Sequence, residues 1–254
     1  MNLNYYGISA KGKKSPENED NFLLPIKNDV YKLVPDTKNK GHLFLLCDGM
    51  GGSRAGEVAS QLCCGWFFKE YYDNSEEIED IHRWMEEEID SLNNRLFQLS
   101  EEYAEYNGMG TTLVNLLIKD DIAYFNNVGD SRLYLFRNNE LKQLTEDDSE
   151  VWKLYKAGLI TKDEILINPR KNIITRAIAT RSFIEVHKYT EIKTKSRDIF
   201  ILCSDGLTDF VKDSEIAEIL KSKINIVEKT KTLLKIAKEN KTNDDTTIIG
   251  VLVE

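Results

Sequence analysis

The sequence predicts a fold of the α+β class, in which helices pack on antiparallel sheets. Short β-rich runs follow one another directly along the chain, and the helical segments come mostly in pairs. Strands and helices therefore do not alternate as they would in a doubly wound parallel sheet. The 254 residues include only 4 prolines and no Gly/Ser linker or repeat, so we expect a single domain over 1–254.

Strands are predicted where aliphatic and aromatic residues gather in short runs bounded by polar residues. These runs are residues 43–47, 111–118, 122–128, 133–137, 199–203 and 246–253. Asn138 and Asn139 separate two strand-like pieces. Because Asn tolerates a positive φ, this pair predicts a tight hairpin.

Helices are predicted at residues 53–72, 76–103, 214–221 and 226–239. In the second of these segments Ile81, Met85, Ile89 and Leu92 recur every three or four residues and define one apolar stripe. The opposite face is rich in Glu, which we interpret as ordinary solvation. Helices of this kind would bury one stripe against a sheet.

Composition excludes several classes of function. Asp and Glu number 43 against 34 Lys and Arg, a formal charge of −9, so a nucleic-acid binder is not expected. No apolar run is long enough to span a bilayer and no signal peptide is recognisable, so we expect a cytoplasmic protein without membrane contact. The 4 cysteines lack CxxC spacing and the 3 histidines are too few for a zinc site, so we expect reduced, buried thiols.

Carboxylates recur in one context, at the end of an apolar run. Asp48, Asp130 and Asp205 each have a glycine as a neighbour, and Asp244 opens the last predicted strand. Any one Asp-Gly pair is typical of a simple turn. Their repetition indicates a cluster, because an ionised carboxylate beside an apolar core needs a positive partner. Oxygen ligands favour Mg²⁺ or Mn²⁺ over Zn²⁺, and two such ions can promote phosphoryl transfer.

Other devices for phosphoryl chemistry are missing from the sequence. There is no GxxxxGK[ST] loop and no set of kinase motifs. Cys47 and Arg54 are similar to the ends of a cysteine phosphatase loop, but their spacing is one residue too long. Asp48 would also oppose the low thiol pKa that such a loop needs. The residues therefore favour metal-assisted phosphoryl chemistry.

An ordered series of motifs resembles the metal-dependent Ser/Thr protein phosphatases of type 2C, in their compact bacterial form. The motifs are residues 12–22 (GKKSPENEDNF), 47–52 (CDGMGG), 110–112 (GTT), 128–134 (VGDSRLY), 144–149 (LTEDDS), 202–209 (LCSDGLTD) and 244–249 (DDTTII). Residues 157–177 (AGLITKDEILINPRKNIITRA) resemble the family's mobile flap, which we place at about 150–183. The family commonly has His where this chain has Asp148.

The resemblance implies a fold and an activity. The fold would be a four-layer α-β-β-α sandwich of two antiparallel sheets between pairs of helices. The activity would be hydrolysis of phosphoserine and phosphothreonine on proteins by a hydroxide that bridges two Mn²⁺ or Mg²⁺ ions, without a phosphoenzyme. The implied partners are phosphorylated targets of a Ser/Thr kinase in signalling, and we expect a monomer.

The resemblance also assigns a metal centre, made of acids and one backbone carbonyl. Its metal-binding residues would be Glu19, Asp20, Asp48, Gly49, Asp130, Asp205 and Asp244. The catalytic residues among them would be Asp20, Asp48, Asp205 and Asp244. Asp48 would bridge the two ions, Glu19 and Asp20 would hold metal-bound waters, and Asp130 matches the acid linked to a third, weaker ion.

One position departs from the family pattern. The family's phosphate-binding Arg lies five residues before the acid that Asp20 matches, and that position is Ser15. Ser cannot offer the bidentate fork of Arg. We expect Lys13 or Lys14 to replace it and assign Lys14 and Ser15 to phosphate binding, although both lysines are equally consistent with solvated loop residues.

Two alternatives stay open. The first is a catalytically weak protein with the phosphatase fold that regulates or binds a phosphorylated partner; the intact metal acids count against it. The second keeps the chemistry but narrows the substrate to one regulatory protein of a bacterial stress or sporulation switch, and the lack of a sensor domain counts against that. Within the flap, Pro169, Arg170 and Lys171 would either meet acidic phosphorylated substrates or form an ordinary surface loop.

Overall fold

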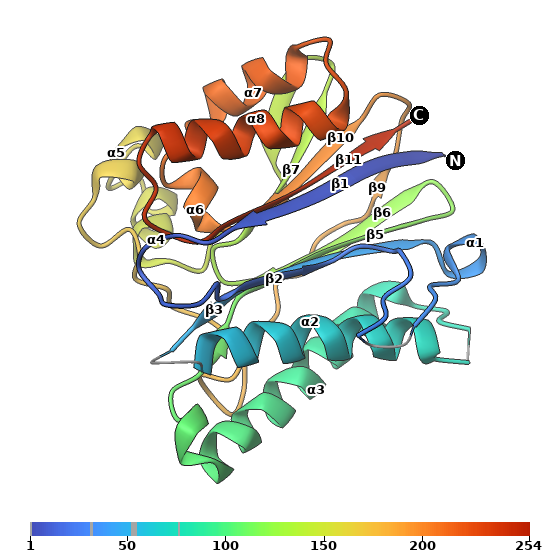
Figure 1. Cartoon of the computed structure of the whole chain (residues 1–254), viewed down its shortest axis with the longest axis vertical. Coiled ribbons are helices and arrows are strands. Elements are labelled where there is room, and N and C mark those ends of the chain that lie inside the picture. Colours follow the sequence, from blue (N-terminus) through green and yellow to red (C-terminus); the bar gives the residue numbers. More distant parts are fainter. Residues whose placement is uncertain (1, 31–32, 52–54, 76) are drawn as a thin grey trace.

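Two antiparallel sheets lie face to face in the computed structural model (Figure 1), which describes residues 2–30, 33–51, 55–75 and 77–254. One sheet contains β1 (Leu3–Ala10), β7 (Arg132–Arg137), β8 (Glu140–Gln143), β10 (Ile199–Cys203) and β11 (Thr246–Val253). The other contains β2 (Asp20–Leu23), β3 (His42–Met50), β4 (Gly110–Thr111), β5 (Leu113–Lys119), β6 (Ile122–Val128) and β9 (Ile192–Lys193). The strand orders are β1-β11-β10-β7-β8 and β2-β3-β5-β6-β9, with β4 paired to β3.

Pairs of helices cover the outer faces of the two sheets (Figure 1). The pair α7 (Asp213–Lys221) and α8 (Ile226–Glu239) covers the first sheet, and the pair α2 (Ala55–Asp73) and α3 (Ile81–Glu102) covers the second. The short helices are α1 (Thr37–Lys40), η1 (Ala104–Tyr106), α4 (Glu150–Lys156), α5 (Lys162–Ile167) and α6 (Asp205–Thr208). The predicted α+β class and the four-layer sandwich are confirmed.

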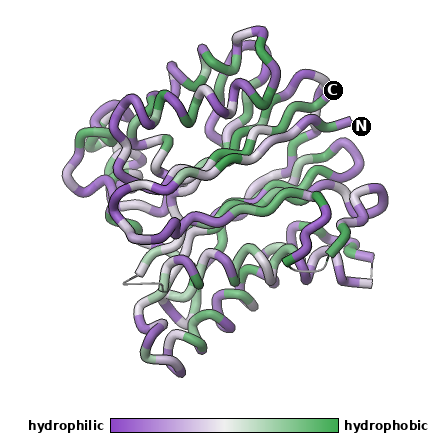
Figure 2. The backbone as a smooth tube through the Cα atoms, in the orientation of Figure 1, coloured by the Kyte–Doolittle hydropathy of each residue, from purple (hydrophilic) through white to green (hydrophobic). Residues whose placement is uncertain are grey.

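Apolar side chains fill the space between the layers. Phe44, Leu116, Phe200 and Val251 have no exposed surface and pack between the two sheets. Separate apolar clusters lie between each sheet and its helices, and Figure 2 shows the hydrophobic residues concentrated along the strands and on the inward sides of the helices. Because burial of apolar surface contributes about 25 cal/mol per Å², these layers hold the strand ends in fixed relative positions.

Most predicted elements are observed close to their predicted bounds. The strands at 122–128, 199–203 and 246–253 and the helix at 226–239 match, and φ angles of 55° and 64° at Asn138 and Asn139 confirm the hairpin. The helix predicted over 76–103 begins only at Ile81, because the side chain of Asp80 accepts a hydrogen bond from the Arg83 amide and starts the helix there. Residues 52–54 and 76 lie outside the described residues. The last residue of the CDGMGG motif and the first residues of the helices predicted at 53–72 and 76–103 are among them.

The strands β1 and β2 are not predicted from the sequence, because half-buried or short edge strands lack a strong apolar run. None of the described helices has the length and apolar character needed to cross a lipid bilayer.

Candidate metal centre

Acids from both sheets converge at one end of the sandwich. Asp20 on β2 and Asp48 on β3 occupy directly opposite positions of the antiparallel pair. Asp205 begins α6, immediately after β10, and the preceding Ser204 donates a hydrogen bond from Oγ to Asp20 Oδ2 at 2.8 Å. This hydrogen bond joins the two sheets directly, so the acids of β2 and β3 lie beside the acid that follows β10.

Asp244 and Asp245, which follow α8, lie at this end of the sandwich and have different partners. Lys14 Nζ forms an ion pair with Asp244 Oδ2. Asp245 accepts hydrogen bonds from the backbone amides of Gly12 at 2.6 Å and Glu19 at 2.7 Å. Asp245 therefore holds the β1–β2 loop that carries Glu19, a role that the sequence did not reveal. Its partners lie more than two hundred positions away in the chain.

Glycines permit the close approach of the backbone segments that carry these acids. A Cβ at Gly49 would lie 2.1 Å from the carbonyl oxygen of Gly56, and a Cβ at Gly206 would lie 1.9 Å from the carbonyl oxygen of Asp245. Neither contact is sterically possible. The glycine beside Asp48 and the glycine beside Asp205 are therefore required by packing, which explains why the Asp-Gly pattern recurs.

Burial and mutual repulsion raise the pKa values of the clustered carboxyls. Asp20 and Asp130 are each only 7% exposed, and burial raises the pKa of each to about 7. Burial also raises the pKa of Asp48 well above its usual range, and the charges of Asp20, Asp205, Asp130 and Asp244 raise it further. The same holds for Asp205, whose pKa is raised by burial and then by Asp130 and Asp244. Full ionisation of the cluster is therefore unfavourable unless positive charge is added to it.

Several oxygens of the cluster have no hydrogen-bond partner. Buried and unpartnered atoms among the described residues include Glu19 Oε1, Asp20 Oδ1, Asp130 Oδ1 and Asp205 Oδ1. Buried polar atoms in native proteins are almost always paired, with protein, water or an ion. Carboxylate oxygens without a His or Cys among them suit a hard divalent cation such as Mg²⁺ or Mn²⁺.

The described acidic side chains do not surround one point closely enough to form a complete ligand set for an ion. Within the described ranges, no three or more His, Cys, Asp or Glu side chains form a ready-made ligand set for one ion. Mg²⁺ and related ions commonly use only one or two carboxylates and retain several waters. A spread set of acids with unpartnered oxygens therefore fits ions that are bound partly through water, and Gly49 lies on β3 next to Asp48 where its carbonyl could contribute.

The three candidate phosphate-binding side chains have different surroundings. The Ser15 hydroxyl lies close enough to Glu19 to favour its ionised form, although burial outweighs this and raises the Glu19 pKa. Lys13 is exposed and lines a cleft that Asp244 also lines. Lys14 is half-exposed and next to the cluster: burial opposes its charge, but Asp244, Asp205 and Asp209 outweigh that effect and raise the pKa of its ammonium. Of the three, Lys14 is the cation at the edge of the carboxylates.

The loop that carries Asp130 is positioned by a residue that the sequence reasoning left without a role. Asp148 accepts a hydrogen bond on Oδ2 from the Gly129 amide at 3.0 Å, and its own amide donates to the Gly129 carbonyl at 2.9 Å. His187 Nε2 and Arg176 lie 2.9 Å and 3.4 Å from the other carboxylate oxygen. An acid replaces the family's usual His at this position, and the imidazole comes from a different part of the chain.

Arg132 and Asp147 form a buried ion pair beside the cluster. The guanidinium contacts the carboxylate at 2.6 Å and 3.0 Å and donates to the Tyr134 hydroxyl at 3.0 Å. Burial opposes the Arg132 charge, but Asp147 outweighs it and raises the Arg132 pKa. These charges therefore neutralise one another without any bound ion.

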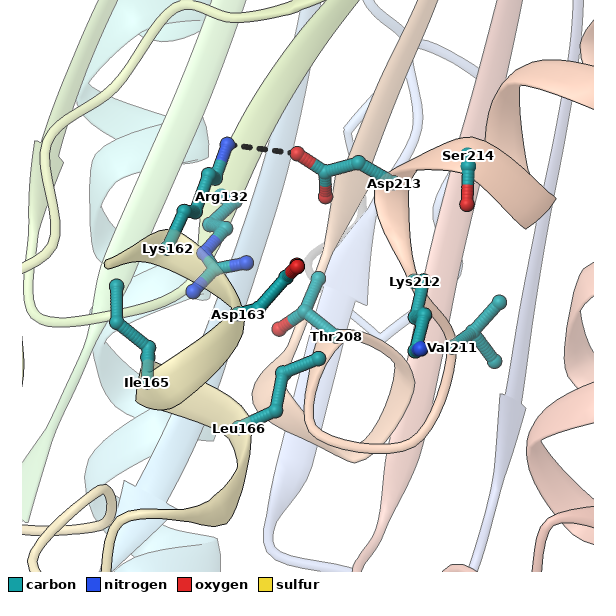
Figure 3. Close-up of a pocket in the computed structure, with 10 residues that line it drawn as sticks. All are labelled: Arg132, Lys162, Asp163, Ile165, Leu166, Thr208, Val211, Lys212, Asp213 and Ser214. Atoms are coloured by element: carbon teal, nitrogen blue, oxygen red, sulfur yellow. Dashed lines mark hydrogen bonds and ion pairs between the residues drawn. The ribbon is translucent and has the colours of Figure 1, made fainter.

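The flap segment lies against α6 and α7 at the same end of the molecule. Lys162 contacts Asp213 at 2.7 Å and Lys171 contacts Asp209 at 2.8 Å, whereas Arg170 pairs with Glu150 within the segment itself at 3.4 Å. A cavity of about 170 Å³ lies between α5 and the α6–α7 region, and Figure 3 shows the Lys162–Asp213 ion pair at its edge. None of the acids assigned to the metal centre lines this cavity, so it is a neighbouring feature and not the centre itself.

Comparison with known proteins identifies the family. The family model for "Protein phosphatase 2C" matches residues 28–240. The chain is 37% identical over 223 residues to the Serine/threonine phosphatase stp of Listeria monocytogenes serotype 4b, covering 87% of both chains. It is 39% identical over 196 residues to the Protein phosphatase PhpP of Streptococcus pneumoniae, covering 77% of this chain and 79% of that one.

Solved structures have the same fold over nearly the whole chain. The Serine/threonine phosphatase Stp1 from Staphylococcus aureus superposes with a TM-score of 0.87 at 32% identity, covering 100% of this chain and 96% of that one. The catalytic domain of the protein phosphatase PstP, crystallised in complex with 2 manganese ions, gives 0.82 at 31% identity, covering 99% of each chain. The fold, the family model and the relatives agree: this chain belongs to the protein phosphatase 2C family of Ser/Thr protein phosphatases.

Proposed function

We propose that this chain hydrolyses phosphoserine and phosphothreonine on proteins at a centre that holds two Mn²⁺ or Mg²⁺ ions. The observation that carries the proposal is the set of buried, unpartnered carboxylate oxygens on Glu19, Asp20, Asp130 and Asp205. The manganese ions in PstP, a relative of the same fold, support the choice of cation. In this proposal residues 1–254 form one catalytic domain, with the segment at about 150–183 as its flap.

Each acid has a specific place in the proposed centre. Asp48 would be shared by the two ions, and Asp205, Asp244 and the Gly49 carbonyl would supply the other protein ligands. Glu19 and Asp20 would hold waters bound to the ions, and Asp130 would belong to a third, weaker site. When bound, the ions would supply Lewis acidity and lower the pKa of water enough to make a nucleophile near neutral pH.

The cysteines cannot serve as nucleophiles in this chain. Cys47, Cys63, Cys64 and Cys203 are all buried and free. Burial raises the pKa of the thiols of Cys47 and Cys64, whereas a nucleophilic cysteine needs a lowered pKa. Direct attack of water on phosphorus, without a phosphoenzyme, is consistent with this.

Lys14 is the side chain that we assign to the substrate phosphate. Its ammonium lies at the edge of the carboxylates and pairs with Asp244, whose charge would be neutralised by a bound cation. Lys provides a point charge and not a bidentate fork, so we expect weaker phosphate binding than an Arg would give. Phosphorylated proteins targeted by a Ser/Thr kinase are the proposed substrates.

Hydrolysis assays test the proposal. The protein is assayed on p-nitrophenyl phosphate and on a phosphothreonine peptide, with Mn²⁺ and with EDTA. We expect turnover with Mn²⁺ and none with EDTA. Turnover that EDTA does not reduce would contradict the metal mechanism. Absence of turnover under every condition would favour a protein that binds phosphorylated partners without hydrolysing them.

A further inference from the structure

A second cleft is lined by lysines and by Asp244. Lys11 and Lys13 come from the β1–β2 loop, and Lys238 and Lys241 come from the end of α8 and the turn that follows it. We call this feature, with a volume of about 460 Å³, the lysine cleft. Figure 1 shows the two contributing segments side by side at one end of the sandwich, in blue and in red.

The ammonium groups of the lysine cleft lack acidic partners. Lys11 Nζ donates to the carbonyl oxygen of Pro16 at 2.7 Å. In the described part of the chain, no carboxylate forms an ion pair with Lys11, Lys13, Lys238 or Lys241. Lys235, one helical turn before the cleft, is paired with Glu239 at 3.6 Å. In a chain of net charge −9, four unpaired lysines around one cleft leave a local positive potential.

Backbone hydrogen bonds join the segments around the lysine cleft. The amides of Lys13 and Lys14 donate to the Asn243 carbonyl at 2.7 Å and 3.0 Å, so the two segments are joined. Lys241 has a φ of 65°, in the left-handed region that favours Gly or Asn. A lysine at this position costs conformational energy that a glycine would not. This conformation ends α8, because the amides of Lys241 and Thr242 donate to the carbonyls of Lys238 and Ala237, both at 3.1 Å.

The lysine cleft adjoins the proposed centre, because Asp244 lines the cleft and also pairs with Lys14. When the phosphorylated residue of a peptide is bound at the centre, the residues next to it in the peptide can therefore reach the lysine cleft. Amines spread over two segments suit several separate carboxylates better than one compact anion. Lys is a flexible, hydrated point charge, which favours recognition by charge over recognition by geometry.

We propose that the lysine cleft is a specificity site for Asp and Glu side chains that flank the phosphorylated residue of the substrate protein. This inference rests on the proposed function, because it assigns a substrate class to the same centre. The ion pairs made on binding would be solvent-exposed, so their contribution falls with salt. Acidic flanking residues would therefore lower KM without changing the chemical step.

The test compares peptides that share one phosphothreonine and differ in their flanks. One has neutral flanks, two carry Glu on either the N-terminal or the C-terminal side, and one carries a second phosphoserine. For the wild type we expect a roughly tenfold higher kcat/KM on a Glu-flanked peptide than on the neutral one, reduced at about 0.5 M NaCl. In the double variant Lys238→Gln, Lys241→Gly this preference falls to about twofold or less.

The variants separate charge from folding. Lys241→Gly relieves the positive φ, so we expect the variant to be at least as stable as the wild type. Lys235→Gln, on the same helix but ion-paired elsewhere, should keep the full preference for Glu flanks. Turnover of p-nitrophenyl phosphate should be unchanged in all of these variants.

Three outcomes would overturn the inference: equal kcat/KM on neutral and Glu-flanked peptides, a preference that persists in the double variant, or a preference for the second phosphoserine alone. Absence of Mn²⁺-dependent turnover of p-nitrophenyl phosphate by the wild type would instead contradict the proposed function. In that case the inference about the lysine cleft is tested by binding alone. Fluorescence anisotropy measures the affinity of the wild type and of the double variant for an unphosphorylated Glu-rich peptide. Weaker binding by the double variant supports it, and equal binding overturns it.

Discussion

Buried charge is neutralised in opposite ways in two adjacent regions of this molecule. Around Arg132, the guanidinium, Asp147 and the Tyr134 hydroxyl satisfy one another at distances of 2.6–3.0 Å. Around Asp130 and Asp205, each carboxylate keeps a buried oxygen without a partner, and neighbouring carboxylates repel one another. The first region is complete within the chain, whereas the second is where we propose that cations bind.

This difference indicates that a stabilising ion pair at Arg132 and a proposed binding site at Asp130 lie only two positions apart in the sequence. A closed pair loses stability when one partner is removed, because the other is left charged and buried. In the cluster around Asp130 and Asp205, removal of an acid should reduce activity. Without bound cations, the same change reduces the repulsion between the remaining carboxylates and should not lower stability. Substitutions in the two regions should therefore move different measurements.

The largest expected effect is that of Asp205→Asn on turnover. The substitution removes a ligand charge at nearly constant shape, so we expect kcat with Mn²⁺ to fall by at least about a thousandfold. In EDTA the variant should unfold at the same or a higher urea concentration than the wild type. Asp121→Asn, in the exposed β5–β6 turn, is the matched control and should alter neither measurement. A clear loss of stability in EDTA for Asp205→Asn would contradict the comparison of the two regions.

The next largest effect is that of Arg132→Met on stability. We expect the free energy of unfolding to fall by about 3–5 kcal/mol, because Asp147 is left buried without its counter-charge. Urea denaturation in EDTA measures this. Arg83→Met, which breaks the exposed pair with Glu87, should leave the urea concentration at the unfolding midpoint nearly unchanged. Equal effects at the two arginines would show that burial does not distinguish these pairs.

Lys14→Ala tests the one cation at the edge of the carboxylate cluster. On a phosphothreonine peptide with neutral flanks we expect KM to rise roughly tenfold, with kcat and Mn²⁺ affinity little changed, because a charge-assisted contact to phosphate is lost. Lys13→Ala should leave KM on this peptide unchanged. If KM responds to Lys13→Ala and not to Lys14→Ala, the assignment of the phosphate-binding lysine is wrong.

The smallest effect concerns an isolated carboxyl far from the centre. Glu88 also has a buried oxygen without a partner, and burial, followed by the charge of Glu70, raises its pKa from 4.5 to about 7. Between pH 4.5 and about pH 7 the folded state therefore keeps a proton on Glu88 that the unfolded state has released. The free energy of unfolding falls as pH rises through this window. Glu88→Gln should remove this fall and gain about 1 kcal/mol at pH 8. Thermal unfolding at pH 5 and pH 8 checks it, and an equal gain at both pH values would contradict the assignment.

Local sequence signals predicted the features that depend on neighbouring residues. The Asn138-Asn139 hairpin was predictable because its geometry is an intrinsic preference of Asn. The β5–β6 turn at Asp120 and Asp121 has similar φ angles, 52° and 62°, but Asp is a weaker signal for them and the turn was not predicted. The α+β class was predictable because it follows from the order of the elements alone.

Contacts between distant segments could not be predicted in this way. Asp245 binds the amides of Gly12 and Glu19, and nothing near Asp245 in the sequence marks it as different from Asp244. The contact between Asp148 and His187 likewise joins two segments that have no common motif. Acids at strand ends indicated which residues carry the chemistry, whereas the residues that position them emerge only when the sheets are stacked.

The two hydrogen bonds that Asp245 accepts have a thermodynamic consequence. They tie Gly12, in the wall of the lysine cleft, and Glu19, beside the carboxylate cluster, to one side chain. Two ligands that stabilise the same loop assist one another, and the assistance is reciprocal. An acidic peptide should thus increase the affinity for Mn²⁺ by the same factor by which Mn²⁺ increases the affinity for the peptide. The β1–β2 loop would make this phosphatase most responsive to scarce manganese when its substrate is already bound.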